Sequence, residues 1–297
     1  MNNHLIYLTA ITATIFILVS STAQAADISV DTSPFCPANT PTDRYIINTN
    51  VTFNCTAPVY IYVNEGYSAI FVNNFYTLDM NGTVLIGNSS GIGIELGSNS
   101  ILKNGIIRNY STAVLLVNSS NNTVSNNTLS NNDVAIYFDS GFNHIIIKNM
   151  INNNTYAIYF SSTSNATISN NTISTNGYGI YFYSGSNNII TKNMVNDNNN
   201  GIYLFSTSNN TLSNNTVNNN DYGIYFSNST NNMLISNILN NNKNTAIYLE
   251  SSPFSTLTAN NMTGNAYNLW AYDQYMATQN ISDTNLAEGK PIYWLNG

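Results

Sequence analysis

One tyrosine recurs at intervals of 22 residues through the middle of the chain, and one inserted residue precedes its last copy. Aromatic rings present flat faces that stack on sugar rings, while the phenol hydroxyl stays in contact with water. The same rings can instead stack on one another and stabilise a sheet, and the sequence leaves both interpretations open. The candidate ligand-binding residues of this series are Tyr137, Tyr159, Tyr181, Tyr203, Tyr225 and Tyr248, and the residues that could flank them are Tyr156, Tyr178 and Tyr222.

Two carboxylates, Glu95 and Asp139, are the candidate catalytic residues, because each takes the fifth place in its repeat. Glycoside hydrolysis needs two carboxyl groups about 5–9.5 Å apart. Two repeats separate this pair, which corresponds to roughly 10 Å if successive repeats stack as neighbouring strands. A lyase would need a basic residue near bound cations, and Lys148 and Lys192 are isolated in the sequence. We therefore expect a non-catalytic protein, and a polysaccharide hydrolase or lyase that uses these acids is the alternative.

The residue types that bind copper are sparse in this chain. Copper sites are built from clustered His, Cys or Met side chains. His144 is the one histidine after the N-terminal apolar segment, and Met150 and Met194 share a repeat position but lie two repeats apart. We therefore expect no metal site and no cofactor, and a copper accessory protein is a remote alternative.

The chain has two cysteines, Cys36 and Cys55. In an exported protein a lone pair of cysteines usually forms a disulfide. The loop that it would close, about 20 residues long, corresponds to roughly 3 kcal/mol of stabilisation in the chain-entropy model. Two free thiols are the alternative.

The N-terminus resembles an export signal. An apolar run from Leu5 to Val19 is followed by SSTAQA, with small residues at Ala23 and Ala25, as before a signal-peptidase cleavage site. The run is shorter than the roughly 20 residues of a membrane-spanning helix. We therefore predict a signal peptide at residues 1–25 and a secreted, cell-surface or periplasmic protein without a transmembrane span after cleavage. An uncleaved anchor is the alternative, since the basic residues that usually begin a signal are missing.

Charged residues make up only 7% of the chain, and the formal net charge is −7. A nucleic-acid-binding surface needs a cluster of basic residues. The composition therefore argues against nucleic acid as a partner. It leaves glycans or other envelope material as possible partners and says nothing about the oligomeric state.

The elements that would position these residues follow from the 22-residue repeat, which we call a coil. Coils begin at Gly91, Ala113, Ala135, Ala157, Gly179, Gly201, Gly223 and Ala246. Positions 2 and 4 of a coil are apolar in alternation with polar residues, as in a strand with one buried face. Positions 12 and 17 are isolated apolar residues in polar surroundings, and Gly and Asn lie between them. The pattern predicts three short strands per coil and an all-β, single-stranded, right-handed parallel β-helix.

A leucine-rich repeat has a similar length and is the competing repeat fold. It needs a fixed leucine spacing and a helical segment. No coil has that spacing, and the many Asn and β-branched residues disfavour a helix.

The ends of the chain depart from the repeat. Residues 26–58 contain four of the six prolines and both cysteines, and we predict that they form an N-terminal cap with the disulfide. The β-helix is then predicted for residues 59–268. The last part, residues 269–297, contains both tryptophans and is predicted to be a C-terminal cap that protects the open end from pairing with another chain.

Asparagine fills two coil positions almost without exception. Stacked carboxamides about 4.8 Å apart can form a hydrogen-bonded ladder, and Asn also tolerates the left-handed corner conformation. These residues are therefore predicted to be structural. Position 9 is occupied by Asn99, Asn121, Asn143, Asn165, Asn187, Asn209 and Asn231, and position 15 by Asn127, Asn149, Asn171, Asn193, Asn215, Asn237 and Asn260.

The repeat GIYF…SNNT(I/L)SNNT(I/V) resembles that of the NosD-type family of right-handed β-helix proteins. TLDMNG at Thr77–Gly82 is similar to the opening motif of such helices, and EGKPIYWL at Glu288–Leu295 is similar to the closing motif of archaeal members. The resemblance extends over roughly residues 35–297. It implies a carbohydrate-binding or sugar-hydrolase domain, a surface protein or a copper accessory protein. Our first hypothesis is an exported surface protein that binds glycan or envelope material through the tyrosines, or that serves as a structural or adhesive rod.

Overall fold

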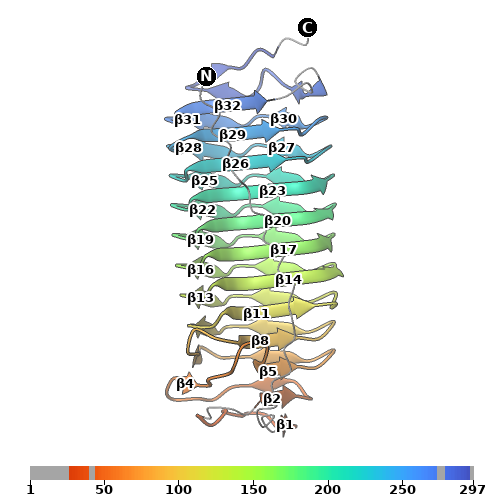
Figure 1. Ribbon diagram of the computed structural model, residues 1–297, viewed down its shortest axis with the longest axis vertical. Coiled ribbons are helices and arrows are strands. Elements are labelled where there is room, and N and C mark those ends of the chain that lie inside the picture. The colour runs from red at the N-terminus through yellow and green to blue at the C-terminus, as the bar shows by residue number, and fades with distance from the viewer. Residues whose placement is uncertain (1–26, 40–43, 273–277, 295–297) are drawn as a thin grey trace.

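The computed structural model describes residues 27–39, 44–272 and 278–294. The predicted signal peptide, residues 1–25, lies outside these ranges. Within them the chain winds into a right-handed solenoid of stacked coils (Figure 1), and three long sheets run along its axis. The prediction of a right-handed parallel β-helix is confirmed. No helix in the described ranges is long and apolar enough to cross a membrane.

Sheet 1 carries the tyrosine series and is the sheet with the longest strands. Its neighbouring strands are parallel throughout, as one strand per coil requires. In order along the axis its strands are β1 (Asp27–Val30), β2 (Arg44–Ile47), β5 (Ser68–Val72), β8 (Ile92–Leu96), β11 (Thr112–Val117), β14 (Val134–Phe142), β17 (Tyr156–Ser164), β20 (Tyr178–Ser186), β23 (Asn200–Ser208), β26 (Tyr222–Ser227), β29 (Thr245–Glu250) and β32 (Tyr267–Tyr272).

Sheets 2 and 3 are built from shorter strands. Sheet 2 contains β3 (Val51–Thr52), β6 (Thr77–Asp79), β9 (Ile101–Lys103), β12 (Thr123–Ser125), β15 (Ile145–Ile147), β18 (Thr167–Ser169), β21 (Ile189–Thr191), β24 (Thr211–Ser213), β27 (Met233–Ile235), β30 (Thr256–Thr258) and β33 (Asn280–Ile281). Sheet 3 contains β4 (Val59–Tyr60), β7 (Val84–Ile86), β10 (Ile106–Arg108), β13 (Thr128–Ser130), β16 (Met150–Asn152), β19 (Thr172–Ser174), β22 (Met194–Asn196), β25 (Thr216–Asn218), β28 (Ile238–Asn240), β31 (Asn261–Thr263), β34 (Leu286–Ala287) and β35 (Lys290–Pro291). The last two strands of sheet 3 pair antiparallel.

The core consists of similar apolar side chains at equivalent coil positions, stacked along the axis. Coil positions 2 and 4 point inward from sheet 1, and the phenylalanines at position 4 stack face to face, with ring centroids 4.4 Å apart for Phe138 and Phe160 and 4.3 Å apart for Phe160 and Phe182. These rings are fully buried. Burial of one such side chain contributes about 1.5–3 kcal/mol, so the repeated core holds each coil to its neighbours.

The predicted asparagine ladder exists at coil position 15. From Asn149 onward each carboxamide oxygen accepts from both the backbone and the side-chain nitrogen of the asparagine one coil earlier, as Asn193 does from Asn171 at 3.0 Å in both bonds. The Asn193 amide donates to Asn215 at 3.0 Å and to the backbone oxygen of Ile168 at 2.9 Å. The ladder therefore satisfies backbone groups that the corners leave without a strand partner.

Two further buried ladders were not predicted. They occupy coil positions 20 and 10, each directly after a residue with positive φ. The first contains Asn132, Asn154, Asn176, Asn198, Asn220 and Asn242, and the second contains Asn188, Asn210 and Asn232. Asn122 takes the same coil position as the second ladder and accepts from the Ser100 nitrogen, but His144 and Ala166 separate it from Asn188. The position 9 asparagines have φ between 55 and 60° and form corners, in the left-handed conformation that Asn tolerates. Their side chains form ladder bonds only among Asn99, Asn121 and Asn143 in the described ranges.

The coil frame differs from the prediction at β8. Ile94 pairs with Ile70 and with Val114, so the sheet 1 register advances by 24 residues into β8 and by only 20 out of it. In sheet 2 the next step, from Leu102 to Val124, is the regular 22 residues. The strict frame of sheet 1 therefore begins at β11 and not at Gly91.

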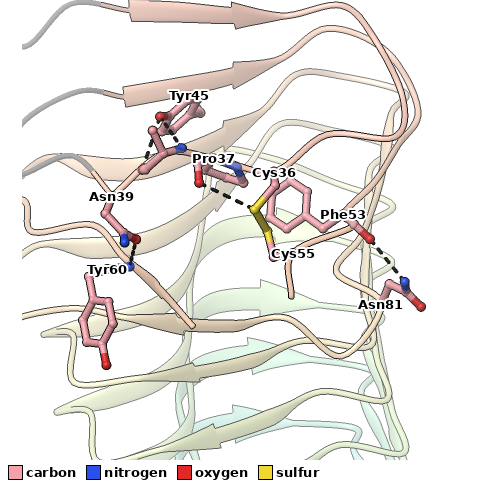
Figure 2. Close-up of a disulfide and its surroundings, with 9 residues drawn as sticks. Cys36, Pro37, Asn39, Tyr45, Phe53, Cys55, Tyr60 and Asn81 are labelled. Atoms are coloured by element: carbon pink, nitrogen blue, oxygen red, sulfur yellow. Dashed lines mark hydrogen bonds between the residues drawn. A yellow bond between two sulfur atoms is a disulfide. The ribbon is translucent and has the colours of Figure 1, made fainter. Parts of the chain in front are cut away.

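A disulfide joins Cys36 to Cys55, as predicted (Figure 2). Close to it the Tyr45 hydroxyl accepts from the Ala38 nitrogen at 2.9 Å, and the Asn39 side chain accepts from the Tyr60 nitrogen at 2.9 Å. This N-terminal segment also contains β1 and β2, which already belong to sheet 1. The limits proposed for the two caps stay predictions.

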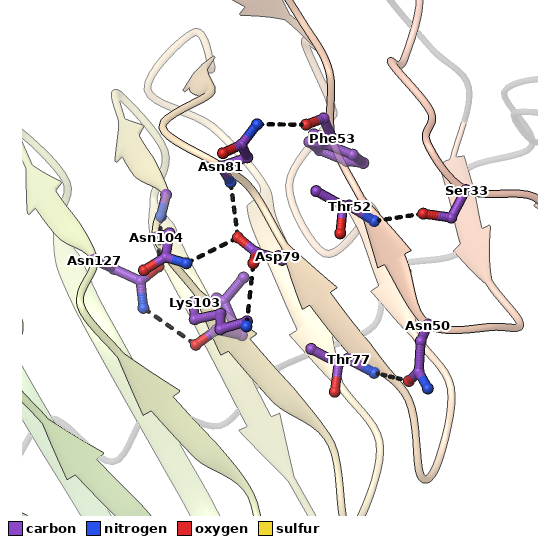
Figure 3. Close-up of polar contacts among 12 residues, drawn as sticks. Ser33, Asn50, Thr52, Phe53, Thr77, Asp79, Asn81, Lys103, Asn104 and Asn127 are labelled. Carbon is purple, nitrogen blue, oxygen red and sulfur yellow. Dashed lines mark hydrogen bonds and ion pairs between the residues drawn. The ribbon is translucent and has the colours of Figure 1, made fainter.

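The segment Thr77–Gly82, similar to the family's opening motif, links the first coils (Figure 3). The Asp79 carboxylate accepts from the Asn104 side chain at 2.9 Å and from the Asn81 backbone at 3.0 Å, and it pairs with the Lys103 ammonium at 3.1 Å. Burial raises the pKa of Asp79, but these hydrogen bonds and the Lys103 charge together lower it. The motif therefore has a structural role at the corners that follow β6 and β9.

Candidate functional site

The tyrosines of coil position 3 form one continuous line across the outer face of sheet 1. The backbone register places each directly beside the next, from Tyr137 in β14 to Tyr248 in β29. Successive ring centroids are 5.1, 5.1, 5.3, 4.7 and 4.7 Å apart. Each ring is half-buried by its neighbours. We call this line the tyrosine stripe.

A second line of tyrosines widens this aromatic surface. Tyr156 and Tyr178 stack on each other with centroids 4.9 Å apart, and each lies 5.3 Å from a stripe tyrosine, Tyr159 and Tyr181 respectively. Tyr222 takes the equivalent place beside Tyr225 at 5.6 Å. The expectation that these residues flank the stripe agrees with the register.

The stripe continues beyond the residues that the sequence singled out. Trp270 in β32 pairs with Tyr248 and so takes the next place in the line. The Gly-Ile-Tyr signature of the coils is lost there, so the sequence pattern places Trp270 in the predicted C-terminal cap. The signal that remained was an aromatic residue 22 residues after Tyr248.

The phenols of the stripe are held in their neutral form. Burial raises the pKa of Tyr159 and of Tyr203 to about 12, and neighbouring tyrosines or carboxylates add to the effect. Burial also raises the pKa of Tyr181. At neutral pH the stripe therefore offers aromatic faces and hydroxyl groups without phenolate charge.

Glu250 is an acid of this face that the repeat pattern does not single out. It shares the outward register of coil position 5 with Ser227 and Tyr272. Its Oε2 atom accepts from the Tyr225 hydroxyl at 2.6 Å and from the Ser227 hydroxyl at 3.0 Å. The carboxylate is therefore fixed at the edge of the stripe.

The two candidate catalytic acids do not share a coil position, which corrects the sequence assignment. Glu95 is in register with Leu115 and, through it, with Tyr137, whereas Asp139 is in register with Val117. The shift at β8 moves Glu95 by two residues along the strand. From the strand spacing and rise, their Cα atoms are about 12 Å apart.

Glu95 is also directed away from Asp139. Its carboxylate pairs with the Arg44 guanidinium at 3.3 Å and accepts from the Ser68 hydroxyl at 2.9 Å, both on the N-terminal side of β8. The Arg44 guanidinium also lies 4.7 Å from the centre of the Phe71 ring. Both partners are about one-third exposed, so the pair contributes at most about 1 kcal/mol. Its geometry is that of a surface ion pair.

The fold defines the chain as a right-handed parallel β-helix protein. It matches the family model described as "Right handed beta helix region" over residues 135–285 and the model described as "Periplasmic copper-binding protein (NosD)" over residues 27–194. Each match covers more than half of the chain, and the protein belongs to the NosD family of β-helix proteins. No curated protein shows significant similarity to the chain.

Several solved structures share the fold. The mannuronan C-5 epimerase AlgE4 A-module of Azotobacter vinelandii is 12% identical, with a TM-score of 0.60 over 87% of this chain and 89% of that one. The DFA-IIIase of Arthrobacter chlorophenolicus A6 without its lid is 10% identical, with a TM-score of 0.62 over 83% and 89%. The periplasmic alginate epimerase AlgG is 15% identical, with a TM-score of 0.53 over 83% and 73%. At these identities the likeness shows the fold alone.

The donor set does not fit the copper that the family description implies. Both cysteines are in the disulfide, and the buried His144 ring packs against Phe138 with centroids 4.9 Å apart. Met150 and Met194 lie on β16 and β22, with β19 between them. In the described ranges no three His, Cys, Asp or Glu residues gather as a metal site would require.

Proposed function

We propose that this protein is exported and binds glycan chains of the cell surface or extracellular matrix along the tyrosine stripe, without cleaving them. The single observation that carries the proposal is the unbroken line of half-exposed aromatic rings, which extends from Tyr137 to Trp270 on the outer face of sheet 1. A polysaccharide is itself a line of repeating rings. A stripe with one ring per coil can therefore contact successive sugars through their apolar faces.

Export is supported by the disulfide and by the periplasmic description of the family. Disulfides persist in oxidising compartments and are rare in the cytosol. The covalent link between Cys36 and Cys55 therefore fits a location outside the cytoplasm.

The two acids on which the enzyme alternative depends do not lie in a suitable geometry. Glu95 is held by Arg44, and Asp139 lies on a different line of sheet 1. Asp139 and Glu250 share coil position 5, but five strand spacings separate β14 from β29. Five spacings correspond to about 24 Å, far beyond the separation that glycoside hydrolysis uses.

The test measures retention and products together on a panel of neutral, anionic and amine-bearing polysaccharides. Tyr181 and Tyr203 are both changed to leucine, a residue that the same register already accepts at position 115. Loss of two aromatic contacts is expected to weaken binding about tenfold or more. The matched control changes Tyr60 and Tyr62, two exposed tyrosines outside the stripe, to leucine.

We expect retention by the unchanged protein and by the control, weak retention by the stripe variant, and no released sugar. Equal retention by the stripe variant and the control would show that the tyrosine stripe does not bind the glycan. Released products that disappear in Glu95→Gln or Asp139→Asn would make the protein an enzyme. Absence of any binding would leave a structural rod.

A further inference from the structure

The C-terminal end of the tyrosine stripe is hollowed into an aromatic bowl. The cavity has a volume of about 310 Å³ and is lined by Tyr222, Asn244, Thr245, Tyr248, Tyr267, Trp270 and Tyr272. The Tyr267 and Trp270 rings meet edge to face with centroids 5.3 Å apart, so the wall is not flat like the rest of the stripe. Five aromatic rings around one small cavity form a site for a single ring-sized group.

Glu250 lies beside this bowl, outside its lining, and its negative charge acts on Tyr248 in the wall. Two of its neighbours on the outer face, Tyr248 on the same strand and Tyr272 on the next, line the cavity. Both of its protein hydrogen bonds, from Tyr225 and Ser227, go to Oε2. In the described part of the chain Oε1 accepts none, so it remains available to a ligand.

In the described ranges no basic residue forms an ion pair with Glu250. The ion pairs in the described ranges are those of Arg44, Lys103 and Lys243, and none of them involves Glu250. Lys243 directly precedes Asn244, which lines the bowl, and its ammonium lies 2.9 Å from the Asp221 carboxylate. The Thr245 hydroxyl donates to the Asn244 oxygen at 3.2 Å, and among the described residues the Asn244 side-chain nitrogen donates no hydrogen bond.

We propose that the bowl binds a hexosamine residue through its protonated amino group, as the specific end site of the glycan surface proposed above. Aromatic faces attract a cation through their ring quadrupoles, and they also pack against the apolar face of a sugar ring. A carboxylate that accepts from an ammonium group forms a charge-assisted hydrogen bond, roughly twice as strong as a neutral one. The same charge repels a uronate and gains nothing from an N-acetylated sugar.

The test compares three ligands by calorimetry with the full protein at about pH 6, where the amine is protonated. The ligands are oligomers of equal length of glucosamine, of N-acetylglucosamine and of mannuronate. The variant is Glu250→Gln, which keeps an oxygen that accepts from Tyr225 and Ser227. The control is Asp139→Asn, on the same coil position at the other end of the stripe.

We expect the unchanged protein to bind the glucosamine oligomer about tenfold more tightly than the N-acetylated one, as loss of a charge-assisted bond predicts. Glu250→Gln should bring this ratio close to one, and Asp139→Asn should leave it unchanged. Tighter binding of the N-acetylated or uronate oligomer, or a ratio unaffected by Glu250→Gln, overturns the hexosamine site while leaving glycan binding in place. No binding of any oligomer overturns both proposals.

Discussion

The Tyr225 hydroxyl donates a hydrogen bond of 2.6 Å to the Oε2 atom of Glu250, which lies in the next strand of sheet 1. The bond links the tyrosine stripe to a carboxylate on the neighbouring line of the sheet. Burial raises the pKa of Tyr225, and the hydrogen bond and the charge of Glu250 raise it further. One contact thus keeps the phenol neutral and holds the carboxylate beside the aromatic bowl.

Replacement of Glu250 by glutamine is expected to lower the pKa of Tyr225 towards the ordinary value for a tyrosine. The change removes the negative charge that opposes phenolate formation, while burial remains. The measurement is an ultraviolet titration of phenolate absorbance in the Glu250→Gln variant and in the unchanged protein. A Tyr225→Phe variant in both backgrounds identifies the signal, and titration curves that coincide would contradict the role of Glu250.

Much of the stripe could be predicted because the coils between β11 and β29 are regular. A tyrosine at a constant interval beside buried apolar neighbours has only one face left, and one strand per coil places it in register. The disulfide and the position 15 ladder followed from composition and spacing in the same way. Glu250 was not predicted because acids do not recur at coil position 5. Between Asp139 and Glu250 the coils carry other residues there, so the repeat gives no sign that an acid at this position is functional.

The displaced register of Glu95 could not be predicted, for a specific physical reason. Ile92, Ile94 and Leu96 alternate with other residues, so a slip of two residues keeps the same side chains facing inward. The connection before β8 is two residues longer than in later coils, and the connection from β8 to β9 is two residues shorter. The two changes cancel, so Leu102 keeps the regular spacing of 22 residues to Val124. Hydrophobic periodicity reports the face of a strand and is blind to shifts by an even number of residues.

Replacement of Asn193 by alanine is expected to lower the free energy of unfolding by about 3 kcal/mol or more. It leaves the backbone and side-chain donors of Asn171 and the backbone oxygen of Ile168 without their partners in the buried ladder. The measurement is denaturant unfolding followed by circular dichroism.

The matched control is Asn187, an exposed corner residue with a φ of 58°. Alanine there is expected to cost about 1–2 kcal/mol because of the left-handed backbone, and glycine close to nothing. If Asn193→Ala proves as mild as Asn187→Gly, the ladder does not stabilise the solenoid in the way that its hydrogen bonds indicate.

The burial of His144 predicts that the protein loses stability in mild acid. It takes coil position 10, where the preceding coil has Asn122 and the following coil has Ala166, and in the described structure neither of its ring nitrogens has a partner with good hydrogen-bond geometry. Burial lowers the pKa of His144 to about 4, and the backbone of Ser119 acts more weakly in the opposite direction. An unfolded chain has a histidine pKa of about 6.5, so between these values the unfolded state binds a proton that the folded state does not.

His144 therefore does not lower the free energy of unfolding above about pH 6.5. As the pH falls towards 4 the free energy of unfolding decreases, by about 3 kcal/mol at the limit. A His144→Asn variant removes the titrating group and supplies an oxygen that can accept from the Asn122 backbone nitrogen, as Asn122 does from that of Ser100. Since the carboxylates titrate in both proteins, the difference between their unfolding free energies isolates the histidine. We expect this difference to grow in favour of His144→Asn from about pH 7 to about pH 5, and a difference independent of pH would show that His144 is protonated without penalty in the folded state.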